Sequence, residues 1–199
     1  MALISGKTIL TSISLFHITL GFFFLTNPLT ISDQALVYIL GEAMGLPHVR
    51  AFETPSPPLA FLAAILMIFG LCDLVTLSMP DEIVLVHHWG TQAPLRLFLS
   101  IMLVMYSFFF SSSSPLYATS SGVADGRLRH PSAHLRNENY VPSGWGGDGW
   151  KNRVFFTFMF VEMASWFWAW VTLREERREF LAKKMQKRRG SQGGKVGSF

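Results

Sequence analysis

The apolar residues of the chain gather in four long blocks that polar stretches separate. Each block is 18 or more residues long, about 27–33 Å as a helix, which matches the hydrocarbon core of a bilayer. The blocks cover residues 8–26, 58–79, 95–112 and 154–173. This pattern predicts an all-α integral membrane protein with four transmembrane helices, in a single membrane domain over residues 1–185.

A weaker apolar segment follows the first block. Residues 31–46 carry apolar positions at helical spacing, and Thr30 with Asp33 resembles a capping box. The segment is too short to span, so we expect one interfacial amphipathic helix that ends at Gly45 and Pro47.

Three other stretches complete the predicted layout. Residues 80–93 are expected to form a turn at membrane level, with Pro94 opening the third span. Residues 111–150 are rich in Ser, Gly, Pro and Asn, which favours a disordered loop. The fourth helix should continue as a charged extension and give way to a basic disordered tail over residues 186–199. Trp166, Trp168 and Trp170 near the end of the fourth span indicate a membrane interface.

The charge distribution predicts an orientation. Charged residues make up only 15% of the chain, and of its 17 Lys and Arg, nine lie in residues 174–199. The positive-inside rule therefore places the C-terminus in the cytosol, and four spans place the N-terminus there too. Five basic residues in the stretch 113–153 oppose this orientation.

Most of the basic excess lies beside an apolar helix, where a membrane surface explains it better than nucleic acid does. One interpretation is that this cluster contacts anionic lipid; the other is that it is a solvated flank that only sets the topology. The cluster consists of Lys183, Lys184, Lys187, Arg188 and Arg189.

Ionisable residues inside the spans are costly, and each requires a partner or a function. His17, Asp73 and Glu162 are the three such residues. One hypothesis is a polar cluster for ion or proton movement or for a lipid head group; the other is that each residue joins helices by hydrogen bonds. Because a short connection makes the second and third spans neighbours, we expect Asp73 to pair with Arg96.

The sequence contains only weak candidates for metal-binding or catalytic motifs. His87 and His88 are adjacent and cannot share one metal ion on a helix, whereas His130 and His134 have ligand spacing in a stretch unsuited to a helix. We expect no metal and no cofactor. A lipid enzyme that uses His87, His88 or Glu162 is a third hypothesis without a supporting motif. The single cysteine excludes an internal disulfide.

Three short stretches resemble signature segments of the fungal "increased loss of mitochondrial DNA" protein family. They are residues 40–47, 92–96 and 172–177, and the resemblance extends over about residues 10–180. It implies a fungal endoplasmic-reticulum membrane protein whose loss impairs maintenance of the mitochondrial genome, with a link to growth on fatty acids. It implies no established reaction and supplies no catalytic residues.

Together these observations predict a non-enzymatic endoplasmic-reticulum membrane protein. We expect a scaffold or accessory subunit in lipid or membrane homeostasis, whose effect on the mitochondrial genome is indirect. Its expected partners are membrane lipids and other membrane proteins, and nucleic acid is not among them. The alternative is a small ion channel or carrier that uses His17, Asp73 and Glu162.

Overall fold

The computed structural model describes residues 4–80, 82–111, 114 and 145–196. Within these residues the fold is all-α and contains no strand, as predicted. Four helices are long and apolar enough to cross a membrane, in agreement with the four apolar blocks. They are α1 (Gly6–Thr26), α4 (Pro57–Thr76), α5 (Trp89–Phe109) and α6 (Arg153–Val196).

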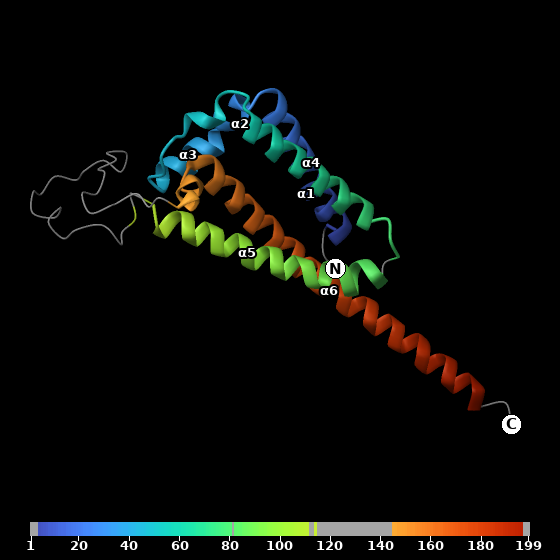
Figure 1. The fold of residues 1–199 in the computed structure, drawn as a ribbon. Coiled ribbons are helices and arrows are strands. Elements are labelled where there is room, and N and C mark those ends of the chain that lie inside the picture. The colour runs from blue at the N-terminus through green and yellow to red at the C-terminus, as the bar shows by residue number, and fades with distance from the viewer. Residues whose placement is uncertain (1–3, 81, 112–113, 115–144, 197–199) are drawn as a thin grey trace, which may run out of the picture.

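The four long helices form two antiparallel pairs, α1 with α4 and α5 with α6 (Figure 1). The pairs meet where α1 packs on α6, around a buried cluster that includes Leu10, Trp89 and Trp166. At the other end of α1, the short helices α2 (Leu29–Ser32) and α3 (Ala35–Ala43) connect the pairs, because α3 packs on α6.

Glycines let α1 and α4 approach closely. A Cβ atom added at Gly70 would lie 2.6 Å from the backbone oxygen of Ser14, and one at Gly21 would lie 2.8 Å from the backbone oxygen of Ala63. Backbone atoms cannot move aside as a flexible side chain can. The small residues therefore set the spacing of this pair, as is common for helices in membranes.

We expect Gly70→Ala to lower the thermal stability of the purified protein. Overpacking costs about 1–3 kcal/mol and the gain in helix propensity is about 1 kcal/mol, so the net loss should reach at most about 2 kcal/mol. Ala64→Val adds atoms to an exposed position on the same helix and serves as the control. Equal melting temperatures for the two variants would show that the close approach is unimportant.

The segment predicted as one helix over residues 31–46 is broken in two. Asp33 ends α2 and Gln34 is extended (φ −62°, ψ 135°), so the predicted capping box is wrong. On a continuous helix Ile31 and Val37 would point about 120° apart. The break lets both side chains reach the same buried cluster.

The predicted end of this segment is correct. Gly45 has φ 63°, its N–H donates to the Glu42 carbonyl at 3.1 Å, and the Leu46 N–H donates to the Gly41 carbonyl at 2.8 Å. This is a Schellman arrangement, which needs a residue that tolerates positive φ.

The turn predicted over residues 80–93 is wrong. A wide π-helical turn, η2 (Ile83–His88), leads directly into α5, and Pro94 lies inside that helix. Trp89 and Ala93 are fully buried in the core, which explains why the helix extends so far upstream. A proline within a spanning helix is tolerated when the surrounding helices support the backbone.

The tail over residues 186–199, which was predicted to be disordered, is helical as far as residue 196. The α6 helix has 44 residues, about 66 Å, and continues through residues 186–196. The Arg, Glu, Lys and Gln residues before Gly190 are good helix formers, and each residue added to an existing helix gains a hydrogen bond.

The predicted loop over residues 111–150 falls mainly on residues 115–144, which lie outside the described residues. Its end is ordered. The 3₁₀ turn η5 (Gly146–Trp150) brings the ring of Trp150 within 6.1 Å of Tyr106.

Candidate functional site

The predicted contact between the second and third spanning helices is present. Arg96 Nη1 lies 2.6 Å from Asp73 Oδ2, and Arg96 Nη2 lies 2.9 Å from Asp73 Oδ1. The side chains of Asp73 and Arg96 are only 5% and 15% exposed. Two parallel N–H···O bonds are the strongest geometry available to a guanidinium and a carboxylate. They link α4, which packs on α1, to α5, which packs on α6.

Aromatic rings enclose the same guanidinium. The Arg96 Cζ atom lies 4.3 Å from the ring centre of Phe69, 4.8 Å from Trp166 and 5.2 Å from Trp89. The two tryptophans are stacked, with ring centres 5.7 Å apart. Ring faces attract cations, so this aromatic cage stabilises the charge that the bundle takes out of water.

A second buried contact joins the first and fourth spanning helices. His17 Nε2 lies 2.9 Å from Glu162 Oε1, and Trp166 Nε1 donates to Glu162 Oε2 at 2.6 Å. The glutamate carboxyl group thus has a partner on each oxygen. Glu162 and Trp166 are four residues apart on α6, which places them on one face of the helix.

The two contacts belong to one polar network. Trp166 donates to Glu162 and also faces Arg96, and the Phe69 ring lies edge-on to His17 at 5.7 Å. All four spanning helices contribute a side chain. The predicted pair of Asp73 and Arg96 is therefore connected with His17 and Glu162, directly or through one ring. Two ring nitrogens, His17 Nδ1 and Trp89 Nε1, are buried without a hydrogen-bond partner among the described residues.

Comparison with known proteins gives one match. Residues 4–183 match the family described as increased loss of mitochondrial DNA protein 1. The chain belongs to this family. No curated protein and no solved structure matches.

The family match covers all four spanning helices and every residue of the polar network, and it ends within the charged part of α6. The description of this family links the protein to the maintenance of mitochondrial DNA, and its four apolar helices make it a multi-pass membrane protein.

The three stretches that resemble family signatures each carry a contact between distant elements. In the first, Glu42 accepts from Arg153 Nη2 at 2.5 Å and so attaches α3 to α6. The second contains Arg96. In the third, Glu176 Oε1 accepts from the backbone N–H of Gly6 at 2.8 Å, which places a carboxylate at the N-terminus of α1.

Sequence reasoning missed the aromatic part of the network. Trp166 was predicted to mark the membrane interface with Trp168, but Trp166 is 1% exposed and Trp168 is 52% exposed. The spacing of Glu162 and Trp166 was the available signal. No sequence pattern indicated Trp89 or Phe69, because their roles depend on how four helices pack.

The other candidate residues lie outside this network. His87 is exposed, and His88 stands edge-on to Trp89 with ring centres 4.9 Å apart. His130 and His134 are not among the described residues. In the part of the chain that is described, no group of three or more His, Cys, Asp or Glu side chains could hold a metal ion.

The predicted lipid-contact residues lie on the extension of α6. Lys183 and Lys187 are exposed, and Lys184 forms an ion pair with Glu82. The side chains of Arg188 and Arg189 are not described. Lys184 therefore helps to attach α6 to the start of η2 as well as carrying positive charge.

Proposed function

We propose that this protein is a non-enzymatic scaffold or accessory subunit of the endoplasmic-reticulum membrane, acting in lipid or membrane homeostasis. Its effect on the mitochondrial genome is then indirect. One observation carries the proposal: His17, Asp73, Arg96 and Glu162 all pair with side chains of another helix. Polar and charged side chains paired in this way hold helices together, and paired groups are not available for ion transport or catalysis.

The three signature stretches support the same role. Each fastens an element to a distant part of the chain, through Glu42, Arg96 or Glu176. A binding surface for other membrane proteins needs a rigid arrangement of helices, and these contacts supply it. The exposed faces of the spanning helices offer large apolar side chains, such as Phe61 at 70% exposure, to lipid or to a neighbouring helix.

Affinity purification in mild detergent tests the scaffold role. We expect one membrane protein to co-purify at the same ratio in two different detergents, and its abundance to fall in cells that lack this chain. An unrelated four-span protein of the same membrane is the control. Elution of the chain alone, with no other membrane protein changing in abundance, would contradict the proposal.

The proposed topology places both termini in the cytosol. The basic extension of α6 motivates it, and the Gly6–Glu176 contact supports it because the N-terminus then lies beside the point where α6 leaves the membrane. We expect protease added to sealed endoplasmic-reticulum microsomes to remove a C-terminal tag. A tag that stays protected until detergent is added would reverse the orientation.

A small channel or carrier is the second candidate, and one observation favours it. His17 Nδ1 is buried without a partner among the described residues, and its ring belongs to the network that crosses the bundle. Ion flux in proteoliposomes separates the two candidates. The scaffold proposal expects flux no greater than in protein-free liposomes. Flux that Glu162→Gln abolishes would favour the channel.

A further inference from the structure

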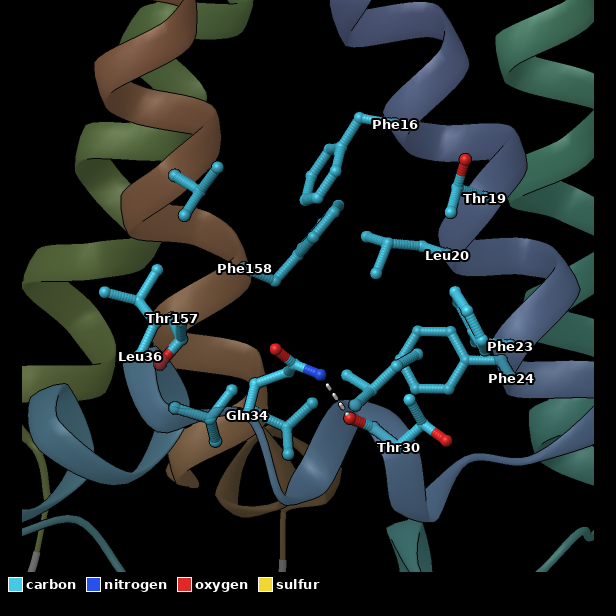
Figure 2. A pocket seen from close by; sticks show the side chains of 14 residues that line it. Phe16, Thr19, Leu20, Phe23, Phe24, Thr30, Gln34, Leu36, Thr157 and Phe158 are labelled. Atoms are coloured by element: carbon cyan, nitrogen blue, oxygen red, sulfur yellow. Dashed lines mark hydrogen bonds between the residues drawn. The ribbon is translucent and has the colours of Figure 1, made fainter.

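A cavity of about 370 Å³ lies between α1 and α6, beside the polar network but lined by other residues. Helices α2 and α3 close one end of it, as Figure 2 shows. Its volume falls within the range of small-molecule sites in proteins. Most of the side chains around it come from the apolar spans of α1 and α6, which places that part of the cavity at the depth of the lipid chains, and the others come from residues 30–37.

The two ends of the cavity differ in polarity. Phe16, Leu20 and Phe158 form the wall at one end, and Gln34 and Thr30 lie at the other (Figure 2). The Gln34 side-chain amide donates to the Thr30 carbonyl at 2.8 Å, which leaves the Gln34 carbonyl oxygen and the second amide hydrogen for other partners. An elongated apolar molecule with one polar end fits this arrangement.

Thr157 provides a separate indication of a ligand. It lines the cavity, is 4% exposed, and its hydroxyl has no hydrogen-bond partner among the described residues. Thr19, on the facing helix, instead donates its hydroxyl to the Leu15 carbonyl at 2.8 Å, the usual arrangement for threonine in a helix. A buried hydroxyl without a partner is unfavourable, and a carbonyl oxygen of a ligand would satisfy it.

None of the cavity-lining residues is charged. A phosphate or a free carboxylate would therefore enter without a cation to balance it, at a large cost in desolvation. An ester carbonyl is uncharged and accepts hydrogen bonds. Apolar walls also hold water poorly, so hydrocarbon is the natural occupant of this space in a bilayer.

We propose that the cavity binds one esterified acyl chain of a membrane phospholipid. The chain lies between α1 and α6 with its end toward Phe16 and Phe158, and its ester lies at the end of the cavity that Gln34 borders. The head group remains outside at the level of α2 and α3. This inference goes beyond the scaffold role and does not depend on it, because the cavity and the polar network use different residues.

Photo-cross-linking tests the proposal on the full-length protein in detergent micelles. The probe is a phosphatidylcholine with a diazirine in one acyl chain, and labelled peptides are identified by mass spectrometry. We expect labelling of the α1 and α6 residues that line the cavity, and competition by unlabelled phosphatidylcholine. A palmitate probe with the same diazirine should label these residues less.

Two matched pairs of variants locate the site. Leu20→Trp fills the cavity, whereas Leu15→Trp makes the same change at a position on α1 that is 51% exposed. Val161→Phe fills it from α6, whereas Val171→Phe is the control at 38% exposure. We expect each filling variant to lose cavity labelling and each control to keep it.

Several outcomes would overturn the proposal. They are labelling spread evenly over the exposed faces, cavity labelling that persists in a well-folded filling variant, and stronger labelling by palmitate than by phosphatidylcholine. If Leu20→Trp fails to fold, as judged by gel filtration, the Val161→Phe pair decides. If both fail, the distribution of labels and the competition on the unaltered protein decide. Failure of this proposal leaves the partner and microsome experiments unaffected.

Discussion

Replacing Arg96 with Met should be among the most destabilising single changes in the protein. It leaves the buried Asp73 carboxylate, on a side chain that is 5% exposed, without its cation, and it removes the guanidinium from the aromatic cage of Phe69, Trp89 and Trp166. Breaking a buried ion pair by removing one partner costs about 3–5 kcal/mol. Thermal unfolding of the purified protein and its steady-state abundance in cells measure the effect. Arg96→Lys keeps the charge but loses the bidentate geometry, so we expect an intermediate loss.

A double-mutant cycle separates the pair from its surroundings. Asp73→Leu combined with Arg96→Met should be less destabilising than the sum of the two single changes, because no unpaired charge remains. A charge swap, Asp73→Arg with Arg96→Asp, should recover less stability than this double variant. The reason is that a carboxylate at position 96 would face the negative faces of the rings. Additive losses in the cycle would show that the two side chains do not interact.

Glu162→Leu is expected to cause the second large loss of stability. It leaves His17 Nε2 and Trp166 Nε1 buried without an acceptor, and each unsatisfied group costs about 1–3 kcal/mol. Glu162→Gln should be mild, because the amide oxygen can accept from Trp166 while the amide N–H donates to a His17 tautomer with a bare Nε2. Unfolding midpoints in detergent give the comparison.

Glu175 provides the matched control, because it is exposed on the same helix and the same Leu and Gln changes should have little effect there. Equal losses for the Leu and Gln variants of Glu162 would indicate that its charge is essential. A Gln variant of normal stability and abundance that has lost function in cells would favour the channel over the scaffold.

Local physical rules predicted the spans and one polar contact. A block of 18 or more apolar residues has few alternatives to a spanning helix, so the four helices followed from the sequence. The contact of Asp73 with Arg96 followed from the cost of an isolated charge and from their short separation of 23 positions, although α4 packs mainly on α1 and α5 mainly on α6.

The other features depend on packing between segments that are distant in sequence. His17 and Glu162 were both identified, but their pairing was not, because nothing in the sequence indicates that α1 packs on α6. Pro94 was expected to open a helix, yet the burial of Trp89 and Ala93 extends the helix past it. The break at Asp33 likewise depends on the cluster that Ile31 and Val37 share.

The sequence separations of the two buried pairs imply an order of biosynthesis. Asp73 and Arg96 are 23 residues apart and can meet as soon as α4 and α5 have both entered the membrane. His17 and Glu162 are 145 residues apart, so His17 has no carboxylate partner until α6 is translated, although α1 can pack on α4 earlier. Closure of this second pair therefore distinguishes a complete chain from every nascent chain that lacks α6. A truncated product would leave His17 in the membrane without its carboxylate partner, which is costly for an ionisable residue there.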